Sequence, residues 1–163
     1  VLELSRIESG NMSFHCEDCS AHHFAETVYQ THQVISLPPV EFIKEFRDED
    51  VTIHIDRMRL TQVITNFLGN AKKFTSQGHI KLGYFCDKEK KEIHFFVEDT
   101  GAGIPKEELQ MIFERFYKRN EFVQGVGLGL AISKVIVEKM NGHIDVQSEV
   151  NKGSRFTAVL PYL

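Results

Sequence analysis

The chain has few cysteines and no long apolar run. Its 163 residues include three cysteines, Cys16, Cys19 and Cys86. An odd number without a regular disulfide framework is typical of a reducing compartment, so we expect a cytoplasmic protein. No apolar run approaches the roughly 18 residues that a membrane-spanning helix needs, so we expect no membrane contact by this part of the chain.

The chain also lacks an excess of positive charge and an initiator methionine. It has 19 lysines and arginines against 23 acidic residues, a formal net charge of −4. Nucleic-acid binders usually carry basic patches, so we expect no nucleic-acid partner. The start at Val1 has no signal-peptide layout, which favours a segment of a longer protein that can carry a membrane anchor elsewhere. The length and composition are those of one globular domain.

Two of the cysteines lie among histidines, which raises the question of a zinc site. Cys16 and Cys19 have His15, His22 and His23 as near neighbours. Structural zinc sites usually combine two separated pairs of ligands, and this cluster has no second pair at a distance. We interpret it instead as the end of a strand and the start of a helix.

The first third of the chain predicts a short strand, a helix and a hairpin. Residues 11–18 have a strand pattern, and Ser20 is a suitable N-cap for a helix whose apolar side extends as far as Ile35. Residues 42–55 hold short alternating apolar runs around the charged turn 47–50, which predicts a hairpin.

The rest of the chain alternates helices and strands. The clearest helix has an apolar stripe formed by Leu60, Val63, Ile64, Phe67, Leu68 and Ala71. The elements predicted after it are strands at 79–85, 93–97, 143–147 and 155–160, a short helix from Pro105 to near Phe116, and a helix at 128–140 that Asn141-Gly142 stops. Short turns join many of the strands, so we expect an α/β fold, a two-layer sandwich with a mixed β-sheet of about five strands covered on one face by about three helices.

Three polar residues stand in one line on the clearest helix. Asn66, Asn70 and Lys73 follow one another at i, i+4 and i+7, about 120° from the centre of the apolar stripe, at the margin of the core. The Asn70 amide oxygen is a ligand of the kind that Mg²⁺ accepts beside phosphates and waters. Asn66 can hold a metal-bound water or a phosphate, and the Lys73 ammonium can neutralise phosphate charge. A solvated polar face is the alternative, although two asparagines in a strong helix need a reason.

A carboxylate and two glycines follow a predicted strand. Asp99 ends the strand and precedes Gly101 and Gly103. An ionised carboxylate only accepts hydrogen bonds, so it selects a ligand donor such as the exocyclic amine of adenine. The glycines let the backbone lie against a flat base. Alone, the same pattern also fits an ordinary turn between a strand and a helix.

A second glycine-rich segment precedes the last helix. Gly125, Gly127 and Gly129 stand directly before it, and the free N–H groups of a helix N-terminus can cradle phosphate. The polar residues 117–126 show no periodic pattern and include Lys118. A loop with a cation could close over a triphosphate, while a hinge with solvated side chains is the alternative.

Taken in order, these segments resemble the catalytic ATP-binding domains of sensor histidine kinases, which have the Bergerat-type ATP fold. The matching motifs are the N box at 66–74, the first glycine box at 99–103, the F box at 112–116, the second glycine box at 125–130 and a terminal glycine motif at 153–156. Residues 1–10 resemble the end of the dimerisation hairpin that precedes such domains. The resemblance therefore implies a boundary, with the hairpin ending in 1–10 and the catalytic domain at 11–163.

The resemblance implies roles for the matching positions, with ATP and Mg²⁺ as cofactors. The catalytic positions would be Asn66, Lys73 and Lys118, and Asn70 would be the Mg²⁺ ligand. Nucleotide contacts would come from Asn66, Asn70, Lys73, Phe74, Asp99, Gly101, Gly103, Ile104, Lys118, Gly125, Gly127, Leu128, Gly129 and Ser154. One departure is Val126, where the family often has Ser or Thr, so a hydroxyl contact there is lost.

Two alternatives to a kinase remain open at this point. The same fold serves the chaperone, type II topoisomerase and mismatch-repair ATPases, in which the first N-box position is usually a Glu that acts as base towards water. Here that position is Asn66, and Lys73 stands where that branch usually has Asp. A nucleotide-binding module without catalysis is the second alternative, because none of the eight histidines has the following acid and proline of an acceptor site.

The resemblance also implies partners. The acceptor histidine would lie on an upstream dimerisation and phosphoacceptor domain, so we expect this chain not to phosphorylate itself. The full-length protein would be a homodimer that passes the phosphoryl group to an aspartate of a response-regulator receiver domain.

Overall fold

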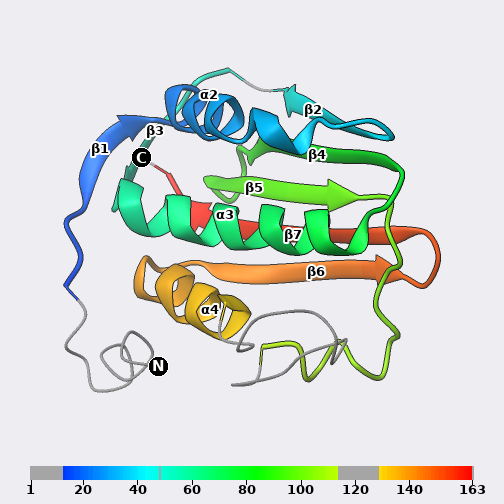
Figure 1. Cartoon of the computed structure of the whole chain (residues 1–163). Coiled ribbons are helices and arrows are strands. Elements are labelled where there is room, and N and C mark those ends of the chain that lie inside the picture. Colours follow the sequence, from blue (N-terminus) through cyan, green and yellow to red (C-terminus); the bar gives the residue numbers. More distant parts are fainter. Residues whose placement is uncertain (1–12, 48, 114–128, 163) are drawn as a thin grey trace.

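A mixed five-stranded sheet carries three helices on one face (Figure 1). The structure is a computed structural model and describes residues 13–47, 49–113 and 129–162. The strand order is β2-β4-β5-β7-β6, with β2 parallel to β4 and the other neighbours antiparallel. The strands of this sheet are β2 (Val40–Phe46), β4 (Gly78–Asp87), β5 (Glu92–Asp99), β6 (His143–Glu149) and β7 (Gly153–Pro161). The predicted two-layer α/β sandwich is confirmed.

The helices are α2 (Ala21–Thr31), α3 (Arg57–Phe74) and α4 (Gly129–Lys139). Helix α3 begins after Asp56, whose carboxylate accepts a hydrogen bond from the Arg59 N–H at 3.1 Å and so caps the helix. The predicted apolar stripe of α3 is buried along its whole length. None of the helices among the described residues is both long and apolar enough to cross a membrane.

The core lies between α3 and the middle of the sheet. Side chains alternate between the two faces of each strand, so partners in register share a face. Leu82, Val97 and Phe156 are such partners on β4, β5 and β7, and all three are buried. The ring of Phe67 from α3 packs on Phe156 with centroids 5.4 Å apart. This contact holds α3 against the sheet.

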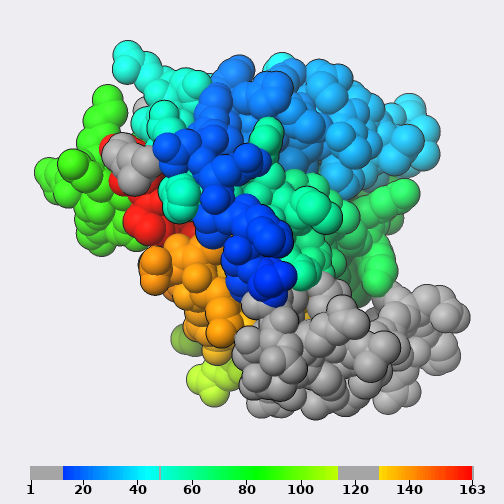
Figure 2. Space-filling model, turned by 90° about the vertical axis from the view of Figure 1, so that its left-hand side faces the viewer, coloured from blue at the N-terminus to red at the C-terminus, as the bar shows by residue number. Residues whose placement is uncertain are grey.

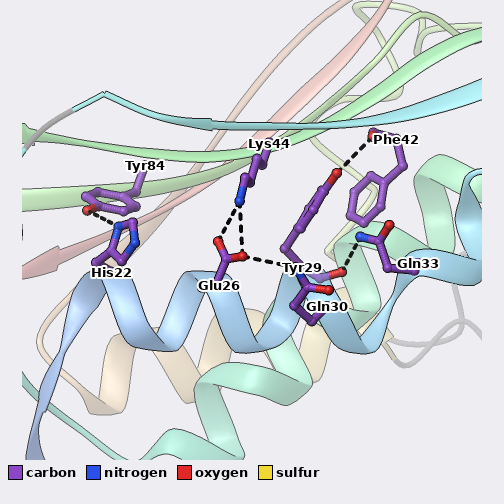
Figure 3. A network of polar contacts seen from close by, with 8 residues as sticks. All are labelled: His22, Glu26, Tyr29, Gln30, Gln33, Phe42, Lys44 and Tyr84. Atoms are coloured by element: carbon purple, nitrogen blue, oxygen red, sulfur yellow. Dashed lines mark hydrogen bonds and ion pairs between the residues drawn. The ribbon is translucent and has the colours of Figure 1, made fainter.

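Helix α2 is fastened to the sheet by polar contacts as well as by its apolar side (Figure 3). The Tyr29 hydroxyl donates to the Phe42 carbonyl oxygen at 3.2 Å, and the Lys44 ammonium donates to both carboxylate oxygens of Glu26 at 3.0 Å. The predicted cap is confirmed, because the Ser20 hydroxyl accepts from the His23 N–H at 3.0 Å. The helix ends at Thr31, however, and Ile35 lies in a separate 3₁₀ turn.

The hairpin predicted at 42–55 is wrong. Strand β2 pairs with β4, while β3 (Thr52–Ile55) pairs with β1 (Glu17–Ser20) in a separate two-stranded sheet. The reason lies just before β3. The Asp50 carboxylate accepts hydrogen bonds from the Ser20 hydroxyl and the His22 N–H, and the Val51 carbonyl accepts from the Ala21 N–H. These bonds tie the segment to the start of α2 and carry it away from β2.

The strand predicted at 11–18 is shifted, because β1 covers Glu17–Ser20. Residues 13–16 run over the surface (darkest blue in Figure 2), and the His15 N–H donates to the Asp56 carboxylate at 2.8 Å. The short helix predicted from Pro105 is also not formed among the described residues, which end at 113 in this part of the chain. Hydrogen bonds there span three residues, as between the Glu108 N–H and the Pro105 carbonyl, and residues 106–113 are turns.

The predicted end of the last helix is confirmed. Asn141 has φ +66°, and its N–H donates to the Glu138 carbonyl, while the Gly142 N–H donates to the Val137 carbonyl at 3.0 Å. This is the Schellman arrangement, which stops α4 and turns the chain into β6. The segments predicted at 1–10 and 117–126 lie outside the described residues.

Candidate nucleotide-binding site

The predicted polar line lies at the margin of α3. Asn66 and Asn70 are half-buried, and Lys73 is exposed. The exposure therefore rises along the line, from the packed middle of the helix towards its solvent end. Amide groups at such a margin stay accessible to a ligand.

Asn66 contacts the start of α4. Its Nδ2 donates to the Gly129 carbonyl oxygen and to the Ser133 hydroxyl oxygen, both at 3.1 Å. The first N-box residue therefore lies beside the last glycine of the second glycine-rich segment, 63 residues along the chain. The rest of that segment, with Gly125, Gly127 and Leu128, lies outside the described residues, as does Lys118.

Asp99 is a buried carboxyl at the end of β5, 8% exposed. Its Oδ1 accepts hydrogen bonds from the Gly101 N–H at 2.9 Å and the Ser154 N–H at 3.3 Å. Burial raises the pKa of Asp99, and the two backbone hydrogen bonds oppose that rise. Within the described part of the chain, no donor reaches Oδ2, so this oxygen can receive a hydrogen bond from a ligand amine.

The segment after Asp99 is folded tightly against the end of α3. The Ala102 N–H donates to the Phe74 carbonyl oxygen at 3.2 Å. A Cβ atom on Gly101 would overlap that same oxygen, and one on Gly103, which has φ +73°, would overlap the Glu149 carbonyl. Because only glycine fits both places, the predicted need for glycine in this box has a structural reason. The contact also brings the end of the N box next to the Asp99 carboxyl.

Ser148 joins three parts of this site, and the sequence reasoning missed it. Its hydroxyl accepts from the Ile104 N–H at 2.7 Å, donates to the Gly153 carbonyl at 3.0 Å and contacts the Ser154 hydroxyl at 2.7 Å. Asp99, Ser154 and Ser148 are register partners on β5, β7 and β6, so they form one row across the sheet. The available signal was a serine at a helix-facing strand position, where alternation predicts an apolar residue.

We expect Ser148→Ala to weaken ATP binding about threefold to tenfold, because the Ile104 N–H loses its acceptor and the row beside Asp99 loses a link. Binding of a fluorescent ATP analogue to the purified domain measures this. Ser36→Ala is the matched control, because it removes an exposed hydroxyl that is distant from Ser148 in the sequence. It should bind the ATP analogue as the wild type does. Equal affinity of Ser148→Ala and the wild type would show that Ser148 does not shape the site.

A hollow of about 450 Å³ lies at the same end of the sheet, and its lining includes Asp99, Ser148 and Ser154. Its charged lining includes Glu98 and Arg155, which are register partners and form an ion pair at 3.0 Å. They alternate with Asp99 and Ser154 along their strands, so they belong to the face that the helices leave uncovered. Its lining comes from β4 to β7 and the turns between them, with no residue of α3.

Comparisons with known proteins place the chain in a family. Residues 55–163 match the model of the histidine kinase-, DNA gyrase B- and HSP90-like ATPases. This match covers more than half of the chain, and the chain belongs to that family.

Two relatives are a sensor histidine kinase and a sensor protein of bacteria. The chain is 33% identical over 167 aligned residues to the sensor histidine kinase WalK of Bacillus subtilis, covering 99% of this chain and 27% of that protein. It is 44% identical over 110 residues to the sensor protein SrrB of Staphylococcus aureus, covering 65% of this chain and 19% of that protein. The predicted resemblance to sensor histidine kinases is confirmed.

Solved structures agree with this placement. Full-length ShkA in complex with AMPPNP superposes with a TM-score of 0.89 at 27% identity, covering 99% of this chain and 34% of that one. The catalytic domain of the histidine kinase ThkA superposes with a TM-score of 0.79 at 28% identity, covering 91% and 97% of the two chains. The chain thus spans about a quarter of WalK, a fifth of SrrB and almost the whole of the ThkA catalytic domain.

Proposed function

We propose that this chain is the ATP-binding catalytic domain of a two-component sensor histidine kinase. It transfers the γ-phosphoryl group of ATP to a histidine on a dimerisation domain outside this sequence. The observation that carries the proposal is the placement of Asn66, which shares α3 with Asn70, beside the first turn of α4, together with the buried Asp99 carboxyl at the end of β5. The AMPPNP complex of the related ShkA supports nucleotide binding.

The adenine end of the site would be built around Asp99. Its free Oδ2 receives the exocyclic amine, and the tightly folded segment with Gly101 and Gly103 lets the backbone lie beside the base. The remaining proposed contacts at this end are Phe74, Ile104 and Ser154. The phosphates would extend towards Lys73 and Lys118, with the second glycine box, Gly125, Gly127, Leu128 and Gly129, around them.

The amide groups of α3 fit a magnesium ion. Asn70 supplies a neutral, hard oxygen, and Asn66 spends both N–H groups of its amide on α4, so that its oxygen is what remains for the site. Mg²⁺ held by Asn70, with Asn66 beside it, would neutralise charge on the triphosphate. The donor set of oxygens at the margin of a helix is one that Mg²⁺ accepts together with phosphates and waters.

The site favours a protein acceptor over water. Asn66 stands where the ATPase branch has a basic Glu, and an amide that donates two hydrogen bonds to α4 cannot take a proton from water. In the proposed reaction, an imidazole nitrogen of the acceptor forms a bond to the γ-phosphorus. The bond between the γ-phosphorus and the oxygen that bridges the β- and γ-phosphates breaks, and ADP leaves with that oxygen. The proton on the other imidazole nitrogen passes to solvent. Rapid ATP hydrolysis by the purified domain would favour the ATPase alternative.

The partners follow from this assignment. We propose that residues 1–10 end the dimerisation and phosphoacceptor hairpin and that 11–163 is the catalytic domain. The full protein would act as a homodimer in the cytoplasm and pass the phosphoryl group to the receiver domain of a response regulator.

The test is to combine this domain with the preceding hairpin, in one chain or as a separate polypeptide, and to add labelled Mg²⁺-ATP. We expect acid-labile phosphohistidine on the hairpin. Asn70→Ala should lower the rate of phosphohistidine formation about tenfold or more. Losing a residue that only supports a metal ligand already costs about tenfold, and Asn70 is proposed to be a ligand itself. Absence of phosphohistidine with the wild-type domain would support the nucleotide-binding module instead.

A matched control separates the metal role from a general effect of removing an amide. Gln30→Ala deletes an exposed amide on α2 whose Nε2 donates to a Glu26 carboxylate oxygen at 3.0 Å. It should transfer phosphate at the wild-type rate. An unchanged rate for Asn70→Ala would remove the metal role from Asn70.

A further inference from the structure

Ser133 is a fully buried hydroxyl on the apolar side of α4. It is 0% exposed, and its helical neighbours on that side, Ile136 and Val137, are also fully buried. Alanine is a better helix former than serine and has no polar atom to bury. If this position served packing alone, the hydroxyl would lower stability compared with alanine. The contact that it makes is therefore informative.

Ser133 accepts a hydrogen bond from the side-chain amide of Asn66, and this bond explains how that amide is oriented. A carboxamide has two N–H donors and one oxygen acceptor. The Asn66 Nδ2 donates to the Gly129 carbonyl and to the Ser133 hydroxyl oxygen, both at 3.1 Å, so both donors are used. The Gly129 carbonyl can only accept, which determines that the nitrogen faces α4. With respect to the described residues, Oδ1 is then the one polar atom of Asn66 left for a ligand.

The orientation of Asn66 depends on Ser133. Without the hydroxyl, one N–H of a half-buried amide has no acceptor, and turning the group to use that N–H elsewhere would weaken the bond to Gly129. A Cβ on Gly129 would lie 3.4 Å from the Asn66 amide carbon, so the amide also packs closely on the first turn of α4. Two hydrogen bonds and this packing leave the amide little freedom.

We propose that Ser133 is a positioning residue. It holds the Asn66 amide with its oxygen towards the nucleotide site, so that Asn66 serves Mg²⁺ or a water bound to Mg²⁺ and does not donate to phosphate. The inference rests on the proposed function, because it assumes a magnesium-nucleotide site beside α3. It goes further by assigning a role to a residue outside the motifs, and by choosing one of the two roles that the sequence left open for Asn66.

The test measures nucleotide affinity with and without magnesium in the wild type and in Ser133→Ala. Binding of a fluorescent ATP analogue is titrated in EDTA and in excess Mg²⁺. We expect Ser133→Ala to lower the gain in affinity from Mg²⁺ about threefold to tenfold while the affinity in EDTA is unchanged. The melting temperature should change by only a few degrees, because the better helix propensity of alanine offsets part of the lost hydrogen bond between Asn66 and Ser133. A purely structural role would shift both affinities together with the melting temperature.

Four further variants make the result decisive. Thr65→Ala removes a hydroxyl from the residue next to Asn66, where it contacts the His32 ring at 3.3 Å, and should keep the full gain from Mg²⁺. Ser133→Cys replaces the hydroxyl with a slightly larger thiol, which is a weak acceptor, and should lower the gain from Mg²⁺ as the alanine variant does. If Ser133 acts through Asn66, then Ser133→Ala adds nothing in an Asn66→Ala background.

The outcomes separate the two proposals. A wild-type domain that binds the analogue without any gain from Mg²⁺ overturns both the proposed metal site and this inference. A full gain in Ser133→Ala, or additive losses in the double variant, overturns only the role of Ser133.

Discussion

Asp99→Asn is expected to weaken ATP binding about a hundredfold or more and to leave the domain at least as stable. In the present structure Oδ1 accepts from the Gly101 and Ser154 N–H groups. An asparagine would keep its oxygen on those donors, and its NH₂ group would then face the adenine amine, so that two donors would oppose each other. Loss of a charged hydrogen bond together with an unpaired donor costs about 3 kcal/mol or more, which corresponds to the expected loss in affinity.

Calorimetric or fluorescence titration of the purified variant with an ATP analogue measures this effect. Asp145→Asn is the matched control, because Asp145 is an exposed carboxylate on β6 that lies 3.6 Å from the His143 ring. It should bind ATP as the wild type does. If the ATP affinity of Asp99→Asn stayed within threefold of the wild-type affinity, the carboxylate would not be the group that accepts the hydrogen bond from the adenine amine.

The pH dependence checks the same assignment. Burial raises the folded-state pKa of Asp99 above its ordinary value of 3.8. Between the unfolded and the folded pKa the native state binds more protons than the unfolded state, so this group's contribution to the unfolding free energy falls as the pH rises through that window. ATP affinity moves the other way and is lost as the pH falls through the folded pKa, because the carboxylate loses its charge. Both trends should be absent from Asp99→Asn.

Phe67→Ala is expected to lower the free energy of unfolding by about 3–5 kcal/mol, the usual cost of deleting a buried aromatic ring. Phe67 is 1% exposed and packs on Phe156 at 5.4 Å between centroids. It stands on α3 directly after Asn66, so the cavity would loosen the helix that carries the polar line. We therefore also expect weaker ATP binding, through loss of packing and not through loss of a contact.

Urea unfolding followed by circular dichroism measures the first effect, and the melting temperature should fall by about 10 °C. Phe85→Ala is the control, since Phe85 is only half-buried, on the uncovered face of the sheet, and stacks on His94 at 4.5 Å. It should cost about 1 kcal/mol. Similar losses in the two variants would show that the contact between α3 and the sheet is not the main source of stability.

Local patterns predicted most elements correctly because their causes are local. The apolar stripe of α3 and the stop of α4 at Asn141 follow from helical periodicity and from a residue that tolerates positive φ. The strands predicted at 79–85 and 93–97 are confirmed as β4 and β5, which pair antiparallel. The failures have causes distant in sequence. Asp50 forms hydrogen bonds with the start of α2, 28 to 30 residues away. Because of this contact, β2 and β3 lie in two different sheets and do not form the predicted hairpin.

The same division applies to the site. The sequence by itself determined the order of the motifs and the chemical types of the side chains: two amides and an ammonium in line on a helix, and a carboxylate followed by glycines. Those features depend on spacing along one chain segment, which periodicity reveals. Only the tertiary structure decided which atoms remain for a ligand. It placed the Asn66 donors on Gly129 and Ser133 and the Asp99 Oδ1 on two backbone N–H groups, because hydrogen bonds between elements far apart in sequence leave no local pattern to read.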